Sequence, residues 1–327
     1  MMFTAKKDYI DQLDALLEDP SVQRKAEPPE AAVEFGVLVA ITDDDLAPPV
    51  TAVARALQER RNARPSVLYV IEISASVPEA SAVAVVLEDE LRDPRIRAKQ
   101  EGEMRAVLHI DGGALAAWPF GIAVGSVAPT VVEHAKREGA EMIVMGLNRH
   151  AVVGRVIGKD TVREVMALGG VPVLAVRPPL TTLPKRIVVA VDFSRASVRA
   201  AHLARRLVDE HGSMHLLFVE SGVLGGTSES AEGQQLIQAK GLEAAFNQLV
   251  SELKPLAGMT IDTVVRKGAA MAEITRFCEK IEPDLVAVGS QRHRFLDRLL
   301  LGSVARSVAA DGRWSTLVTP PARAERA

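Results

Sequence analysis

Three positions in the second half of the chain have the residue types and spacing of a phosphate-binding loop. Gly289 is followed by two residues and then Arg292, and nine further residues separate Arg292 from the pair Gly302 and Ser303. Glycine lets a backbone approach a phosphate closely, and a Gly-Ser pair opening a helix directs free N–H groups and a hydroxyl at an anion. The pattern predicts an anion site, while an ordinary helix N-cap accounts for Gly302 and Ser303 equally well.

Arg292 admits two interpretations. Its long side chain could block a phosphate, or its planar fork could pair with one. His293, Arg294 and Arg298 make the same loop basic, which suits an anion, although a solvated loop face is the commoner meaning of such a cluster. The sequence leaves both interpretations open.

A repeat indicates that the chain contains two copies of one α/β unit. Residues 144–150 resemble residues 287–293, and Gly125 and Gly268 lie equally far upstream of these two segments. Each half also closes with a short apolar strand that two prolines terminate. The boundary between the copies is therefore expected between Pro178 and Lys185.

Composition agrees with two globular domains in one chain of 327 residues. A hydrophobic fraction of 48% with few aromatics predicts cores of small aliphatic residues, as in parallel strands buried on both faces. The formal net charge of −3 favours neither nucleic acid nor an anionic membrane as a partner. We find no segment long enough to span a bilayer and no signal-peptide core, and we expect a cytoplasmic protein.

No metal site is expected. The single cysteine, Cys278, cannot form an internal disulfide. It lies in a predicted helix, where we expect a buried structural thiol in preference to a redox-active one. His211 and His215 are separated by a Gly-Ser turn, so they need not share one helical face as metal ligands would.

Strands and helices alternate in both halves, which predicts doubly wound parallel sheets with ligand sites at the carboxyl ends of the strands. In the second half we expect strands at 186–191, 214–219, 260–265, 285–288 and 316–319, with helices at 194–211, up to about 255, at 270–281 and from 303. In the first half we expect strands ending at 41 and covering 67–71, 120–124, 142–145 and 173–176, with a helix at about 49–60 and uncertain boundaries within 79–117. Residues 1–30 lie outside the repeat. We expect them to form a docking or capping helix on a linker, and a partner-binding arm is the alternative.

Residues 35 to 320 resemble the universal stress protein (UspA-like) domains, here in tandem. In that family a strand ends in a loop reading Gly, two residues, Gly, nine residues, Gly, then Ser or Thr, and members with the full pattern bind ATP. The segment from Gly289 to Ser303 matches three of these four positions, with Arg292 in place of the second glycine. Asp192 also resembles the acidic residue that such domains place against adenosine, although a role in the start of the next helix is the alternative.

The resemblance implies two tandem Rossmann-like, UspA-type domains, at 31–180 and 184–321, that form an intramolecular pseudo-dimer. It also implies a site for ATP or another adenine nucleotide, with or without Mg²⁺, in the second domain. The residues that it assigns to this site are Ala190, Asp192, Val219, Val288, Gly289, Arg292, Gly302, Ser303 and Val304.

The first domain departs further from the family pattern. Thr42 occupies the position of Asp192, Arg149 again replaces the second glycine, and Lys159 and Asp160 follow a loop that is one residue shorter. A carboxylate at the start of a helix caps it well but repels a phosphate there. We therefore expect this domain to be structural or regulatory, with an anion site at Lys159 as the alternative.

Pairing of the last strands, 173–176 with 316–318, would cover two exposed apolar edges. A further homodimer and an unknown protein partner are also compatible with the resemblance. The expected function is a stress-response binding protein without an efficient catalytic site, slow turnover of bound ATP being left open. The alternatives are a nucleotide-free interaction or structural module with degenerate loops, and an enzyme that activates a substrate with an adenine nucleotide.

Overall fold

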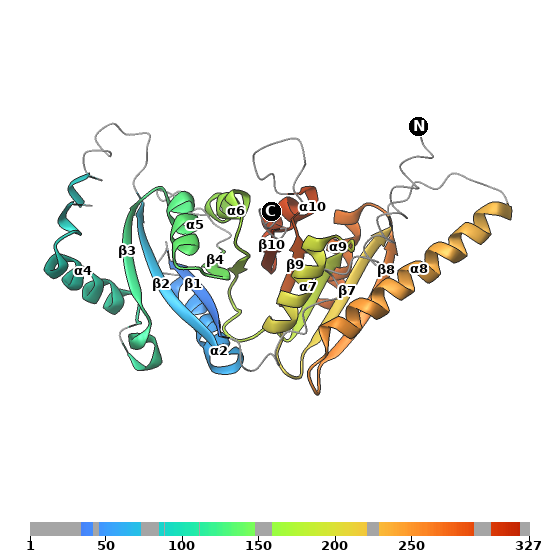
Figure 1. Ribbon diagram of the computed structural model, residues 1–327, viewed down its shortest axis with the longest axis horizontal. Coiled ribbons are helices and arrows are strands. Elements are labelled where there is room, and N and C mark those ends of the chain that lie inside the picture. The colour runs from blue at the N-terminus through green and yellow to red at the C-terminus, as the bar shows by residue number, and fades with distance from the viewer. Residues whose placement is uncertain are drawn as a thin grey trace, which may run out of the picture. The chain divides into compact units, whose positions relative to one another are not determined.

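One ten-stranded sheet runs through both halves of the chain, in the order β3-β2-β1-β4-β5-β10-β9-β6-β7-β8 (Figure 1). All neighbouring strands are parallel except β5 and β10, which are antiparallel. The α/β class and the doubly wound parallel arrangement predicted from the sequence are confirmed. The computed structural model describes residues 34–41, 46–72, 85–87, 89–110, 112–147, 159–220, 229–290 and 302–320.

The first half contributes five strands. They are β1 (Phe35–Ile41), β2 (Ala63–Glu72), β3 (Phe120–Gly125), β4 (Met142–Gly146) and β5 (Val173–Val176). The helices between them are α2 (Ala47–Arg61), α4 (Pro94–Val107), the short 3₁₀ helix η2 (Gly113–Ala117), α5 (Val127–Arg137) and α6 (Lys159–Leu168). Pro94 does not interrupt a helix but opens α4 at a position where no N–H is needed, and the Asp93 side chain caps this end by accepting from Arg95 N–H at 2.8 Å.

The second half repeats this order. Its strands are β6 (Arg186–Val191), β7 (Ser213–Glu220), β8 (Thr260–Lys267), β9 (Leu285–Gly289) and β10 (Ser315–Thr319), and its helices are α7 (Arg195–Leu207), α8 (Glu229–Leu253), α9 (Ala270–Ile281) and α10 (Ser303–Asp311). The predicted helix at 194–211 ends earlier than expected. Val208 is already extended, and Asp209 forms a turn with His211 and Gly212 that redirects the chain into β7.

Strand β2 begins earlier than the sequence suggests, since it includes Pro65. Proline lacks an N–H and is disfavoured inside a sheet. Pro65 pairs with Val37 of β1, whereas β3 joins β2 only from the pair Val67 and Phe120 onward. The proline therefore lies where β2 still has one free edge, and the strand tolerates it.

On one face of the sheet, a continuous apolar core joins the two halves. It contains inward side chains of α5, α6, α9 and α10, for example Val131, Val165, Ile274 and Val308, which are all nearly inaccessible to solvent. Helices α2 and α7 also contact the strands, but their side chains are not part of this cluster. The small aliphatic cores expected from the composition are thus present and extend across the boundary between the repeats.

The last strands of the two halves pair as predicted. Ala175 lies opposite Thr316, Leu174 opposite Leu317, and Val173 opposite Val318. All residues of both strands are buried. Each strand removes the free edge of the other, so the two repeats form an intramolecular pseudo-dimer.

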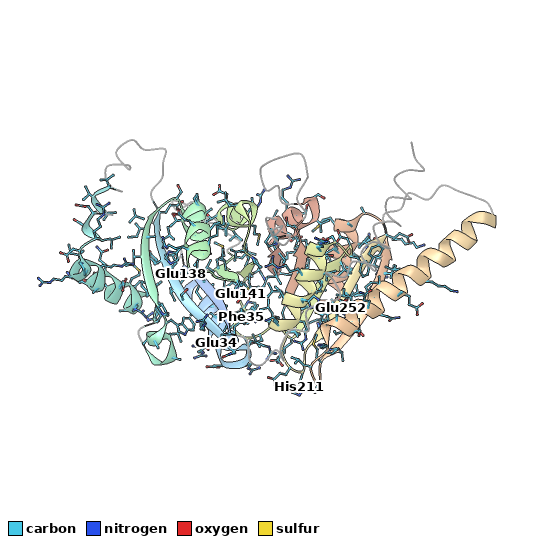
Figure 2. The ribbon with its side chains drawn as sticks, viewed as in Figure 1. Glu34, Phe35, Glu138, Glu141, His211 and Glu252 are labelled. Atoms are coloured by element: carbon cyan, nitrogen blue, oxygen red, sulfur yellow. The ribbon has the colours of Figure 1, made fainter. Side chains whose placement is uncertain are left out.

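A second contact between the halves involves the carboxyl end of α7, where helix carbonyls lack intrahelical partners. Arg61 of α2 donates to the carbonyl oxygens of Arg206 (3.1 Å) and Val208 (2.7 Å), and its side chain is only 13% exposed. The Arg206 guanidinium in turn lies 4.0 Å from the ring centroid of Phe35 and 4.0 Å from the Glu141 carboxylate, two residues labelled in Figure 2. We call this set of contacts the α2–α7 clasp.

The predicted helix near Ile10, Leu13 and Leu17 lies outside the described residues. Among the helices of the described part of the chain, none has the length and apolar character required to cross a bilayer.

Candidate functional site

The two central strands of the second half end side by side where the strand order reverses. From β6 the chain proceeds outward to β7, whereas from β9 it proceeds to β10 on the opposite side. Ala190 of β6 lies opposite Val288 of β9, so Asp192 and Gly289 follow at adjacent carboxyl ends. Ligands of open α/β sheets bind at such a switch point.

Asp192 forms the turn that leads from β6 into α7. Its Oδ1 atom accepts from the N–H (3.0 Å) and the hydroxyl (2.6 Å) of Ser194. Ser194 Oγ in turn accepts from Ser197 N–H at 3.3 Å and caps α7, as the sequence suggests for this serine. Asp192 is exposed, so its carboxylate both organises the turn and faces solvent.

Phe193 holds this turn in an uncommon conformation. Its φ of 57° lies in the left-handed region, which costs a bulky residue about 1–3 kcal/mol. The ring contacts Phe218 of β7 and Phe246 of α8, with centroid separations of 5.8 and 5.1 Å. Two aromatic contacts of about 0.5–1.5 kcal/mol each, in addition to burial, offset that cost. The main chain of Asp192 is thereby anchored to the core.

Gly289 is required by the packing of α7. A Cβ atom at this position would lie 2.4 Å from Ser197 N and 2.5 Å from Ala196 C. Asp192 N–H also donates to Ser197 Oγ at 3.3 Å. The first turn of α7 thus contacts both strand ends, and helix packing alone accounts for a glycine that the sequence associates with close approach of a phosphate.

Four apolar residues assigned to the site share the face that carries α9 and α10. Val288 is 1% exposed, and Ala190, Val219 and Val304 are partly exposed and pack against the same core. They come from β9, β6, β7 and α10, respectively. Their partly exposed surfaces could contact a flat apolar group such as a purine ring.

Helix α10 begins at the Gly-Ser pair. Gly302 occupies the N-cap position in an extended conformation, and no described side chain caps the helix. Ser303 is exposed and Gly302 partly exposed. The first N–H groups of α10, together with the positive end of the helix dipole, could therefore bind an anion, which contributes about 0.3–1 kcal/mol at an exposed helix end.

Several residues singled out from the sequence cannot be placed. Arg292, Arg149 and Thr42 lie outside the described residues. Lys159 and Asp160 form the first positions of α6, but the orientation of their side chains is also outside the described part.

The first half differs from the second at the corresponding glycine. A Cβ atom on Gly146 would lie 2.6 Å from Cβ of Leu46, so a leucine side chain occupies the space that the α7 backbone fills beside Gly289. Helix α2 also has Pro48 and Pro49 in its first turn, where they provide no N–H donors. The two crevices are therefore not equivalent.

Thr319 was not identified from the sequence. It pairs with Gly289 at the end of β10, is completely buried, and its hydroxyl has no hydrogen-bond partner within the described residues. An unsatisfied buried hydroxyl costs about 1–3 kcal/mol. The signal that could have revealed it is a threonine that ends an otherwise buried strand beside the glycine loop.

Two further polar groups of the second half, Glu220 and Cys278, make contacts within the fold. Glu220, at the end of β7, pairs with Lys267 at 3.3 Å. Burial raises the pKa of the Cys278 thiol to about 12, and the side chain is fully inaccessible, as expected for a buried thiol. Within the described ranges, no three histidine, cysteine or carboxylate side chains gather as metal ligands do.

Comparison with known proteins gives a consistent result. The model of the universal stress protein family matches residues 36–177 and again 184–320. A universal stress protein of Methanocaldococcus jannaschii is 29% identical over 146 residues, which cover 44% of this chain and 86% of the relative. Among solved structures, a universal stress protein from Archaeoglobus fulgidus aligns with a TM-score of 0.57 at 16% identity, covering 88% of this chain and 98% of its own. A functionally unknown protein from Pseudomonas aeruginosa has the same TM-score and identity, with coverages of 89% and 94%.

Proposed function

Because this chain belongs to the universal stress protein family, with two tandem copies of the domain, we propose that it is a stress-response regulator that binds an adenine nucleotide in its second domain. The observation that supports this proposal is the junction of β6 and β9. There Asp192 and Gly289 end adjacent strands at the switch point. ATP would place its purine against Ala190, Val219, Val288 and Val304 and its phosphates at the start of α10.

Charge determines which part of the nucleotide each group of the proposed site would contact. The exposed Asp192 carboxylate suits the hydroxyls of a ribose, which can donate to it, and would repel a triphosphate. The phosphates require donors, which the uncapped start of α10 and the Ser303 hydroxyl supply. A helix end contributes only about 1 kcal/mol, so cations must supply much of the remaining affinity. Arg292 and Mg²⁺ are the candidates for that role.

Calorimetric titration of the nucleotide-stripped protein with ATP and Mg²⁺ tests the proposal. We expect one saturable site per chain. Asp192→Asn is the sharper variant, because an amide oxygen can still accept from Ser194 and preserve the turn; it should weaken binding without loss of fold. Asp192→Ala removes the turn as well. Absence of heat and of a thermal shift at millimolar ATP would refute nucleotide binding.

Arg292→Gly separates the two interpretations of that residue. Tighter ATP binding in the variant would identify the arginine as a steric block, since glycine restores the full family pattern. Weaker binding would identify it as a phosphate ligand. Lys267→Gly is a suitable control, because that cation is paired with Glu220 at the edge of the sheet.

The packing of Gly146 and Gly289 favours a second candidate function. Both glycines are required by neighbouring parts of the fold, Leu46 and the first turn of α7, whether or not a nucleotide binds. A nucleotide-free module for protein interaction would keep them for this reason. A protein that shows no ATP binding but remains folded and associates with a partner would support this function.

We also propose domain limits of 31–180 and 184–321, a cytoplasmic location, and a regulatory or structural role for the first domain. The two matches to the family model lie within these limits. Leu46 and the two prolines of α2 support a first domain without its own nucleotide. Limited proteolysis should leave the two domains joined, because β5 and β10 are paired within one sheet.

A further inference from the structure

A cavity of about 280 Å³ lies where the linker leaves the first domain and enters the second. Its walls come from the end of β5, the linker at 178–185, and the starts of β9 and β10. This linker cavity lies at the starts of β6, β9 and β10, whereas Asp192 and Gly289 lie at the carboxyl ends of β6 and β9. Its volume is just below the range of about 300–1,000 Å³ that is typical of small-molecule sites, so it suits a compact ligand.

Three cations line the linker cavity, but they are not equivalent. The Arg313 guanidinium pairs with both oxygens of Asp311, contacts Glu279, and lies 4.6 Å from the Trp314 ring centroid. Its charge is therefore already compensated. Arg177 and Lys185 have no ion pair within the described residues.

The single carboxylate in the lining is also engaged. Asp284 Oδ2 accepts the backbone N–H groups of Lys185 (2.8 Å) and Arg186 (2.9 Å) and fixes the end of the linker. It lowers the positive charge of the cavity without cancelling that of Arg177 and Lys185 together. The lining therefore retains an excess of cationic donors.

Ser315 supplies a buried donor beside these cations. Its residue is 2% exposed, and its Oγ accepts Arg177 N–H at 3.0 Å. The hydroxyl proton itself has no acceptor within the described residues. Such a proton is most easily satisfied by an acceptor that enters the cavity.

We propose that the linker cavity binds a small phosphate group, either inorganic phosphate or the phosphate of a compact metabolite. The Arg177 fork and the Lys185 ammonium would hold the oxygens, and the Ser315 hydroxyl would donate a third contact. Arg177 belongs to the end of the first domain and Lys185 to the start of the second, so the bound phosphate ties the two ends of the linker together. This site is independent of the nucleotide site proposed above.

Tryptophan fluorescence gives a direct test, because Trp314 lines the cavity and only one other tryptophan exists. That residue, Trp118, is buried beside Gln58 in the first domain. Titration of the full chain with inorganic phosphate at constant ionic strength should give a saturable change, and the thermal midpoint should rise with phosphate. Glycerol phosphate tests for a metabolite, since tighter binding than inorganic phosphate indicates that the rest of the cavity is used.

Matched variants locate the response. Arg177→Gln and Lys185→Gln should each weaken binding about tenfold, as expected for loss of one charge-assisted contact. Arg55→Gln and Lys99→Gln, exposed cations on α2 and α4, should leave it unchanged. Asp192→Asn should also leave phosphate binding unchanged, so failure of the nucleotide proposal and failure of this one are distinguishable.

The opposite results overturn the proposal. A fluorescence change that is linear in phosphate and equal for chloride at the same ionic strength would indicate general screening. A response that persists in the Arg177→Gln, Lys185→Gln double variant would place the phosphate elsewhere. A thermal midpoint that phosphate does not raise, together with silent fluorescence, would show that the cavity binds no phosphate.

Discussion

Substitution of Gly289 by alanine should destabilise the protein, because the first turn of α7 leaves no room for a Cβ atom at this position. The added Cβ would lie 2.4 Å from Ser197 N, whereas ordinary contacts begin near 3.4 Å, so the first turn of α7 must move by about 1 Å. Two bonds oppose the movement: Asp192 N–H to Ser197 Oγ at 3.3 Å, and the Arg199 side chain to the Pro320 carbonyl at 3.3 Å. Overpacking of this kind costs about 1–3 kcal/mol. At about 2–4 °C per kcal/mol for a domain of this size, we expect the thermal midpoint to fall by about 2–12 °C.

Alanine substitutions at two further glycines should change the free energy of unfolding by different amounts, and in one case in the opposite direction. Gly241 of α8 has no atom within 4 Å of an added Cβ, so Gly241→Ala should stabilise by about 0.5–1 kcal/mol through helix propensity. Gly146→Ala meets a leucine side chain instead of backbone and should be less harmful than Gly289→Ala. Thermal and urea unfolding of the three variants measures the order. A Gly289→Ala protein as stable as the parent would refute this account of how α7 is held.

Three other substitutions test the remaining contacts. Leu317→Lys places a charge in the fully buried pairing of β10 with β5 and should lower stability by at least about 3 kcal/mol; unchanged thermal unfolding would contradict the pseudo-dimer. Arg61→Ala removes two charge-assisted bonds of the α2–α7 clasp and should cost about 1.5–3 kcal/mol in urea unfolding, whereas Arg55→Ala, an exposed helix pair, should change stability by less than about 0.5 kcal/mol. Burial lowers the pKa of His215, and Asp262 opposes this effect only in part, so the unfolded chain takes up a proton at this residue more readily than the folded chain. The free energy of unfolding should therefore fall as the pH decreases below about 6.5. The variant His215→Gln should reduce that fall in thermal scans from about pH 8 to 5, and an unaltered pH profile in the variant would contradict this role of His215.

The fold could be predicted from the sequence because its signals are local and repeated. Alternation of apolar runs with helical segments gave the parallel sheet, and several helices begin at the expected residues, such as Ser303 of α10 and Ala270 of α9. Errors occurred where neighbouring strands decide the outcome. Pro65 is acceptable in β2 only because β3 joins further along, which no local pattern contains.

The site was less accessible to prediction. The sequence correctly placed Asp192 and Gly289 at strand ends that the sheet brings together. It could not reveal that Gly289 accommodates the α7 backbone, since this depends on the approach of a helix from another segment. Thr319 was not predicted from the sequence for a similar reason, because an unsatisfied hydroxyl can be recognised only when the positions of the surrounding atoms are known. The identity of the ligand, with the role of Arg292, remains a prediction.

The pairing of β5 with β10 has a consequence for synthesis of the chain. The two strands are separated by roughly 140 residues, which take about 7–28 s to translate. Throughout this interval the first domain has a fully apolar strand, Val-Leu-Ala-Val, without the neighbour that later buries it. Two nascent first domains could pair through β5 in the same way, so aggregation competes with completion of the chain. Stalled or truncated products that end before Ser315 should therefore be the species that chaperones and proteases encounter.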